Sequence, residues 1–167
     1  SPLFYFAFDP TGIVGVVEQF IRTGKQIVVK NMAFSPGLDH KAYAAQYDSF
    51  LRAVDEVRKL ERGSIVIDTG AAMEALLRLS LFGKLKGVGT YKYEERNAEM
   101  ESLFARLFDS KLNVIFLHGM RAVWKAIGDG EGARSAKTGE WEPDRPPEIG
   151  YRVQINARAW REKLPDG

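Results

Sequence analysis

Short, continuous apolar runs alternate with longer amphipathic segments over the first 118 residues. Apolar runs without polar alternation predict strands that are buried on both faces of a sheet. These runs cover residues 3–8, 26–30, 64–68 and 112–117. Apolar residues that recur every three or four positions predict helices. The predicted helices cover residues 13–23, 41–60, 71–82 and 94–109. This alternation predicts an α/β fold with a mostly parallel central sheet and helices on both faces.

The last third of the chain departs from this pattern. Residues 127–139 hold four of the 16 glycines and almost no large apolar side chain, which predicts a flexible loop over 126–140. Residues 151–159 alternate apolar and polar side chains, which predicts a strand near an edge of the sheet. We expect the 167 residues to form one domain, because a chain of this length ordinarily builds a single core.

Composition narrows the class of protein further. Cysteine is absent and only two histidines occur, which excludes a disulfide framework or a thiolate metal site and disfavours a histidine zinc site. The formal net charge is +2, so any affinity for nucleic acid depends on local clusters of basic residues. No apolar run reaches the ~18–20 residues of a membrane span, and an apolar strand opens the chain in place of a signal sequence. We therefore expect a soluble, cytoplasmic protein with no membrane partner.

Polar residues follow three of the predicted strands. In parallel sheets ligands bind at the carboxyl ends of the strands, where connecting loops and helix N-termini gather. The polar residues at these ends are Asp9, Asp68, Thr69 and His118. Residues 64–69, Ser-Ile-Val-Ile-Asp-Thr, have the form of a Walker B strand, in which the aspartate projects toward Mg²⁺ beside nucleotide phosphates. The alternative for Asp68 is a cap of the following helix.

Three apolar strands that end in a polar residue, separated by helices, carry a family resemblance. They are residues 6–9, 65–69 and 114–118. Over residues 3–160 the chain resembles the RecA-like ATPase core, and most closely the small phage and prophage AAA-type nucleotide-binding proteins of recombination and single-strand annealing. The resemblance implies a RecA-like three-layer sandwich that binds ATP and Mg²⁺ and acts in a bacterial host.

The resemblance also implies a role for individual residues. Asp68 matches the Walker B aspartate that positions magnesium, and Thr69 matches the hydroxyl residue that follows it. Asp9 stands where these proteins place the acid that activates the attacking water, although they usually use glutamate there. His118 stands where they sense the γ-phosphate, and Asn97 matches a contact on the phosphate side. The alternatives are a turn-forming Asp-Pro for Asp9, a core or loop histidine for His118, and a solvated helix N-terminus for Asn97.

Two stretches match the places where RecA-like proteins contact single-stranded DNA. Both combine basic residues with aromatic ones, which offers phosphate charge and stacking faces. The first contains Lys84, Lys86, Tyr91, Lys92 and Arg96, with Tyr93 beside them. The second contains Arg121, Trp124, Lys125, Arg134 and Lys137. The alternative for both stretches is a solvated basic surface. The resemblance further implies basic residues near a neighbouring subunit of a homo-oligomer at Arg152 and Arg158.

The chain departs from the family at the phosphate-binding loop. A P-loop ATPase requires G-x-x-x-x-G-K-[ST], whose backbone amides and lysine hold the phosphates. The nearest approach, residues 131–138, ends in Lys-Thr but has Glu and Ala where glycines are required. In the family the P-loop strand and helix precede the strand at residues 3–8, so we expect a RecA-like sheet that lacks its N-terminal strand and helix. The gap that the absent strand leaves in the sheet would have to be filled by rearrangement or by another chain.

These observations are compatible with two alternative functions. The first is the ATP-binding core of a recombination or annealing protein that binds single-stranded DNA, not expected to hydrolyse ATP without a P-loop upstream of Ser1. The second is a non-enzymatic interaction module that retains a degenerate ATPase scaffold.

Overall fold

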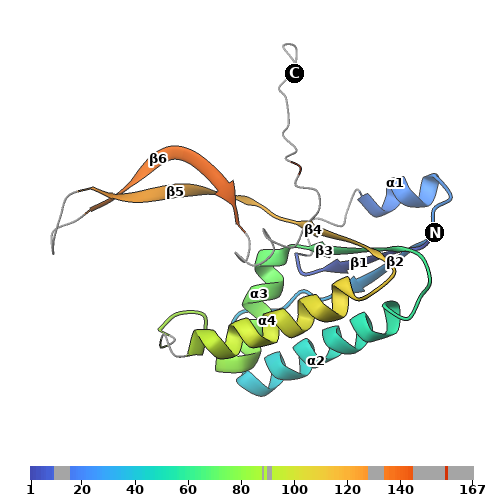
Figure 1. The fold of residues 1–167 in the computed structure, drawn as a ribbon, viewed down its shortest axis with the longest axis horizontal. Coiled ribbons are helices and arrows are strands. Elements are labelled where there is room, and N and C mark those ends of the chain that lie inside the picture. The colour runs from blue at the N-terminus through green and yellow to red at the C-terminus, as the bar shows by residue number, and fades with distance from the viewer. Residues whose placement is uncertain (10–15, 88, 90–91, 128–133, 145–156, 158–167) are drawn as a thin grey trace, which may run out of the picture.

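The computed structural model describes residues 1–9, 16–87, 89, 92–127, 134–144 and 157. Strands and helices alternate through the first part of the chain, and two strands follow (Figure 1). In chain order the elements are β1 (Leu3–Ala7), α1 (Val16–Arg22), β2 (Ile27–Asn31), α2 (His40–Val57), β3 (Ser64–Asp68), α3 (Gly70–Phe82), α4 (Tyr93–Phe108), β4 (Asn113–Leu117), β5 (Met120–Ile127) and β6 (Arg134–Pro143).

Four strands form one parallel sheet in the order β2-β1-β3-β4. The register is regular across it: Ala7 pairs with Asn31 on one side and with Asp68 on the other, and Asp68 pairs with Leu117. The carboxyl ends of the strands are therefore aligned, on the side from which β5 and β6 project (Figure 1). The predicted α/β class with a parallel sheet is confirmed.

The helices α2, α3 and α4 cover one face of the sheet, and α1 lies on the other side (Figure 1). Beneath the three helices is the main hydrophobic core, in which the rings of Phe6 and Phe50 meet edge to face with their centroids 5.5 Å apart. The opposite face carries a smaller buried cluster made of Tyr5, Ala7 and Val66. None of the described helices is long and apolar enough to cross a membrane.

Side-chain caps and a glycine define the helix ends near the carboxyl edge. The Asp39 carboxylate accepts a hydrogen bond from Ala42 N at 2.8 Å, so Asp39 caps α2. At the end of α3, Gly83 adopts φ 67°, a left-handed conformation that glycine tolerates best. The predicted end of this helix at Gly83 is thus confirmed.

The strand β4 lies at the edge of the sheet. The sequence predicted burial on both faces, and this prediction is wrong: Val114 and Phe116 pack toward the helices, but Ile115 and Leu117 on the other face are 44% and 40% exposed. β4 pairs with β3 along one edge, and no other described strand pairs with it. A local apolar run predicts a strand but carries no information on how many neighbours that strand has.

The strands β5 and β6 form an antiparallel hairpin that projects from the body (Figure 1). The predicted flexible loop over 126–140 is therefore wrong for residues 126–127 and 134–140, which are strand. Ladder pairing overrides the weak strand propensity of this polar, glycine-containing segment. Asp144 N donates to Gly119 O at 2.8 Å and closes the base of the hairpin. Residues 128–133 and the predicted strand 151–159, Ala157 apart, lie outside the described residues.

Candidate functional site

Asp68 lies at the carboxyl end of β3 and is the most buried of the predicted site residues, with 8% of its surface exposed. Its backbone carbonyl accepts hydrogen bonds from Phe8 N at 2.6 Å and from Asp9 N at 3.2 Å. These bonds tie the chain after β1 to the end of β3. The exposed Asp9 is therefore next to Asp68, so the structure brings these two predicted residues together. The peptide bond between Asp68 and Thr69 is cis.

Tyr5 contacts Asp68 from the neighbouring strand. Its hydroxyl donates a hydrogen bond to Asp68 Oδ2. Tyr5 and Ala7 point to the same face of β1 and Ala7 pairs with Asp68, so the strand register places phenol and carboxylate on one face. Burial raises the pKa of Tyr5 above its ordinary value, and the hydrogen bond to Asp68 raises it further. The phenol therefore stays protonated and donating at neutral pH, and it takes one of the acceptor sites of Oδ2.

The turn from β3 into α3 brings Thr69, Gly70 and His118 together. The Thr69 hydroxyl accepts a hydrogen bond from Ala72 N at 3.2 Å, so Thr69, and not Asp68, caps α3. The His118 ring follows β4 and lies over Gly70, where a Cβ atom would stand 2.4 Å from His118 Cε1. The ring also stacks on Phe116, with centroids 6.3 Å apart and 15° between the planes. His118 is thereby held beside the first turn of α3.

The donor set of this site suits a hard cation. Mg²⁺ prefers oxygen ligands and is commonly bound by one or two carboxylates together with phosphate oxygens and water. Asp68 and Asp9 bring two carboxylates to adjacent strand ends. Within the described part of the chain, no group of three or more His, Cys, Asp or Glu side chains could hold a metal. The two carboxylates therefore form no complete cation site by themselves, and a cation bound here would need its other ligands from elsewhere.

Asn97 is not brought to this cluster by any contact among the described residues. The sequence placed it at the opening of a helix, but α4 begins at Tyr93, so Asn97 lies in the second turn, and its side chain is exposed. A phosphate contact from this position remains a prediction.

The basic segment between α3 and α4 contributes side chains of two kinds. Lys84 and Lys86 are exposed in the connection, whereas Lys92 places Nζ 5.3 Å from the centroid of the Phe82 ring. Arg96 is buried in α4, and its guanidinium lies 3.4 Å from the Glu74 carboxylate of α3. Arg96 is thus largely buried and paired with Glu74, and its contact with DNA stays a prediction. Tyr91 lies outside the described residues.

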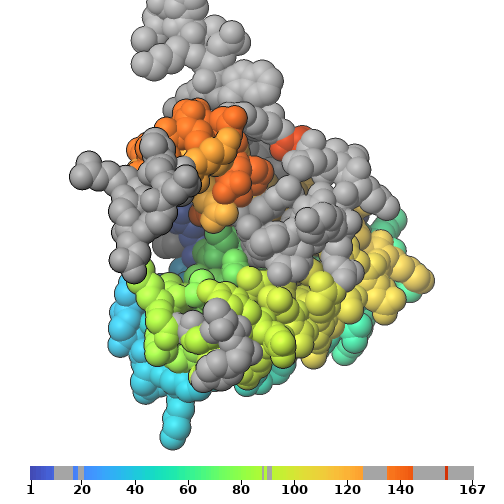
Figure 2. Space-filling view, turned by 60° about the vertical axis from the view of Figure 1, so that its left-hand side comes forward, coloured from blue at the N-terminus to red at the C-terminus, as the bar shows by residue number. Residues whose placement is uncertain are grey.

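The predicted DNA contacts on the hairpin differ in their surroundings. Arg121 forms ion pairs with Glu142 at 2.8 Å and with Asp144 at 3.5 Å. Lys125 is exposed on β5, and Lys137 of β6 places Nζ 5.4 Å from the Trp124 ring centroid. Arg134 begins β6, but its side chain is outside the described part of the chain. In the space-filling view the hairpin, coloured orange, stands above the surface of α3 and α4 (Figure 2).

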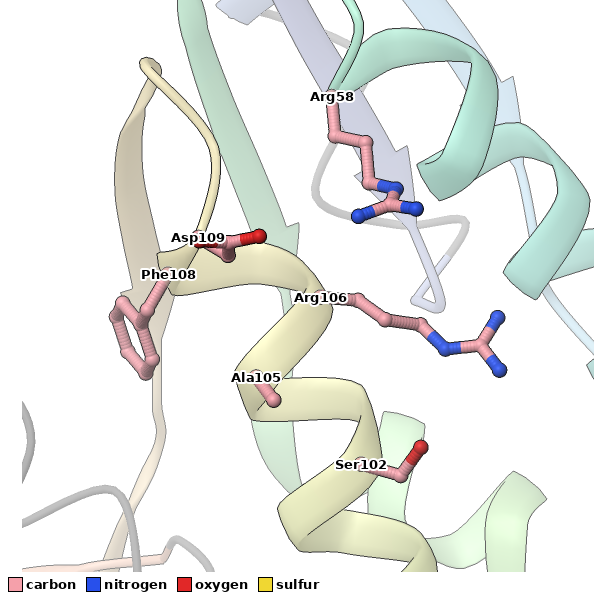
Figure 3. A pocket seen from close by; sticks show the side chains of 6 residues that line it. All are labelled: Arg58, Ser102, Ala105, Arg106, Phe108 and Asp109. Atoms are coloured by element: carbon pink, nitrogen blue, oxygen red, sulfur yellow. The ribbon is translucent and has the colours of Figure 1, made fainter.

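A surface pocket of about 540 Å³ lies between the ends of α2 and α4. Its arginines share one carboxylate: Arg58 Nε lies 2.8 Å from Asp55 Oδ1, and Arg106 Nη1 lies 3.1 Å from Asp55 Oδ2. The side chains of Arg58, Arg106 and Ser102 extend toward the space between the helices, whereas Phe108 points away (Figure 3). Both helices end where they lead into the amino ends of strands, so this pocket is at the opposite edge of the sheet from Asp68.

Sequence reasoning missed three residues that shape these sites. Tyr5 was read as one more member of an apolar run, and its contact depends on the register between β1 and β3. Gly70 carried no signal of its close approach to His118. Arg96 did carry a signal, because Met100 and Leu103 follow it at helical spacing on the buried face of α4.

In comparisons with known proteins, no family model, no curated protein and no solved structure matches this chain.

Proposed function

We propose that this chain is the nucleotide-binding core of a RecA-like ATPase of the phage recombination or single-strand annealing type. The observation that carries the proposal is the meeting of Asp68, Thr69 and His118 at adjacent ends of parallel strands, with the N-terminus of α3 between them. Parallel α/β sheets bind ligands at this edge, and helix N-termini attract phosphate. A Walker B strand needs its aspartate at this position.

Each residue of the site has a distinct proposed role. Asp68 would hold Mg²⁺, which supplies charge neutralisation at the transferred phosphoryl group when it is bound. Asp9, tied to Asp68 through the backbone, would orient the attacking water. His118, fixed against Gly70 and Phe116, would donate a hydrogen bond to the terminal phosphate. Thr69 would keep α3 directed at the phosphates, since its side chain caps that helix.

The missing phosphate-binding loop has a natural place beside β4. The outer edge of β4 has no partner among the described strands, and Ile115 and Leu117 are partly exposed along it. A strand added there in parallel would end next to His118, so the loop that follows it would reach Asp68. We propose that a segment outside this sequence, or another chain, supplies this strand and the P-loop lysine.

Nucleotide binding tests the proposal. Titration of a fluorescent ATP analogue should show Mg²⁺-dependent binding, tightest in the longer product if the reading frame continues upstream of Ser1. Asp68→Asn should abolish the Mg²⁺ dependence, whereas Asp48→Asn, an exposed carboxylate on α2, should leave it unchanged. A longer product that contains a P-loop but binds no nucleotide, or an Asp68→Asn variant with normal Mg²⁺-dependent binding, contradicts this function.

Single-stranded DNA is the proposed second ligand. Lys84 and Lys86, together with Lys125 and Lys137 of the hairpin, are exposed basic side chains on the side of the molecule where the strands end. Each lysine that neutralises a phosphate releases a counterion, so affinity should fall steeply with salt. Lys84→Ala with Lys86→Ala should flatten the plot of log Kd against log salt, while Lys59→Ala at the far end of α2 should not.

A second function is favoured by the Tyr5 contact. The Tyr5 hydroxyl already gives Asp68 Oδ2 a hydrogen-bond donor within the fold, as in a scaffold whose aspartate no longer needs a cation. In that case the chain binds single-stranded DNA or a protein without nucleotide. DNA affinity that is the same with and without Mg²⁺ and ATP supports this second function, and DNA affinity that ATP strengthens excludes it.

A further inference from the structure

The two faces of the β5–β6 hairpin differ in chemistry. Residues that pair directly in an antiparallel ladder share a face, and positions two apart on one strand also share it. Trp124 pairs with Lys137, and Ala122 pairs with Trp141 across a shift in the ladder register between Ala122 and Trp124. Because Ala122 and Trp124 are two positions apart on β5, both pairs are assigned to one face. Arg121 pairs with Glu142 on the other face, where Lys125 also lies.

The side-chain contacts of the hairpin agree with this division. Lys137 Nζ lies over the Trp124 ring, as expected for two residues on one face. Arg121 is held by Glu142 and Asp144, so that side of the hairpin has its arginine charge balanced within the fold. The other side brings together two indole rings and a lysine, and none of the paired residues on it is acidic.

Both indole rings are open to solvent. Trp124 is 55% exposed and Trp141 is 57% exposed, the two largest exposures among aromatic side chains in the described part of the chain. The hairpin that carries both residues extends away from the sheet and helices (Figure 1). Exposed apolar surface of this kind marks a binding site more often than a structural need.

We propose that this face stacks the unpaired bases of single-stranded DNA on Trp124 and Trp141, with Lys137 placing positive charge beside the phosphates. Unpaired bases offer the flat apolar faces that indole rings pack against, and every base offers one, so the contact is independent of sequence. In duplex DNA the base faces are covered by stacking, so the surface selects single strands. This inference rests on the DNA binding proposed above and assigns it a mode, base stacking, and one face of one element.

The test uses a fluorescein-labelled oligothymidine and fluorescence anisotropy. Trp124→Ala and Trp141→Ala should each weaken binding about 5- to 150-fold, the range expected for the loss of one stacked base. Trp124→Phe should recover part of the affinity, since a smaller ring still stacks. Arg121→Ala is the matched control, because it removes a full positive charge from the opposite face of the same hairpin and should change affinity by less than either tryptophan variant. Thermal unfolding followed by circular dichroism checks that all variants keep the fold.

A second oligonucleotide separates stacking from charge. An abasic oligonucleotide keeps the phosphates but has no bases, so Trp124→Ala should weaken its binding far less than it weakens oligothymidine binding. Lys137→Ala should weaken both and flatten the salt dependence, which Trp124→Ala should leave unchanged.

The outcomes distinguish this inference from the proposed function. If the chain binds oligothymidine and the tryptophan variants bind as tightly as Arg121→Ala, stacking is refuted while DNA binding stands. If both oligonucleotides lose affinity equally in Trp124→Ala, the indole acts on the backbone and stacking is again refuted. If the unaltered chain binds no single-stranded DNA, both proposals fail. Tryptophan variants that change only the sedimentation coefficient would assign the face to self-association and refute base stacking.

Discussion

The His118 ring lies against Gly70, where a Cβ atom would stand 2.4 Å from His118 Cε1 and 3.0 Å from Nδ1. This contact joins the end of β4 to the first turn of α3. The first residue of α3, Gly70, and the last residue of β4, Leu117, are 47 positions apart in the sequence. The ring is also stacked on Phe116, which restricts its movement away from Gly70. Glycine is therefore needed at position 70 because of the packed His118 ring, and not because the helix requires it there.

Gly70→Ala should destabilise the protein. In an ordinary helix the same change stabilises by up to about 1 kcal/mol, because alanine has the higher helix propensity. Here the added methyl group collides with a packed ring, so we expect a loss of about 1–3 kcal/mol in the free energy of unfolding. Urea unfolding followed by circular dichroism measures it.

The His118→Ala background provides the control for this prediction. With the ring gone, Gly70→Ala should be neutral or stabilising. The double variant should therefore be more stable than the sum of the two single effects predicts, which is a positive coupling energy when changes in the free energy of unfolding are counted. Stabilisation by Gly70→Ala in the presence of His118 would show that the contact does not constrain position 70.

The sequence was sufficient to predict the local elements of the site but not their meeting. The apolar run before Asp68 and the end of the next helix at residue 82 are local signals, and the structure contains both. The meeting of His118 with Gly70 depends on the pairing of β3 with β4, and the meeting of Tyr5 with Asp68 depends on the pairing of β1 with β3. Strand register is a property of the whole sheet, so a local pattern does not reveal it.

Tyr5→Phe should cost about 1.5–3 kcal/mol of stability, the range for a hydrogen bond to a charged group, because it leaves a carboxylate with 8% exposure short of a donor. The change keeps the ring and its packing, so the loss reports the hydrogen bond. Tyr93→Phe, at an exposed tyrosine that begins α4, should have no measurable effect. Equal stabilities of the Tyr5→Phe and Tyr93→Phe variants would mean that the Tyr5 hydroxyl contributes nothing.

Stability should fall at alkaline pH. Burial raises the pKa of Tyr5 and of Tyr47 in the folded state, helped by the hydrogen bond to Asp68 for Tyr5 and by the charge of Glu99 for Tyr47. In the unfolded chain each phenol ionises near its ordinary pKa of about 10, so the folded state is fully stable below that pH and loses stability above it. The slope should reach about 1.4 kcal/mol per pH unit for each tyrosine.

Urea unfolding at several values between about pH 9 and pH 11 measures this slope. The double variant Tyr5→Phe with Tyr47→Phe should show a flatter profile than the unaltered protein. If the two profiles are parallel, the alkaline loss comes from other groups.

The edge position of β4 and the β5–β6 hairpin were mispredicted for a common reason. Burial on both faces and loop character were both inferred from composition within a short window. The neighbours of Ile115 and the cross-strand partners of Trp124 lie elsewhere in the chain, and they determine exposure in the first case and strand formation in the second. Arg96 differs, because its helical spacing with Met100 already indicated the buried face of α4.

Arg96→Ala should act on stability and not on DNA binding. The Arg96 and Glu74 side chains are 11% and 20% exposed, and removal of one of them deprives the other, mostly buried charge of this ion pair. We expect a destabilisation at the lower end of about 3–5 kcal/mol, since neither side chain is completely buried. Arg96→Met with Glu74→Met should recover most of this loss, because the pair is then replaced by apolar side chains of similar volume.

Lys86→Ala, at an exposed lysine, should show the reverse behaviour: unchanged stability and weaker, less salt-dependent binding of single-stranded DNA. Measured at a temperature where both variants are folded, a DNA affinity that falls in Arg96→Ala as much as in Lys86→Ala would contradict the structural assignment of Arg96.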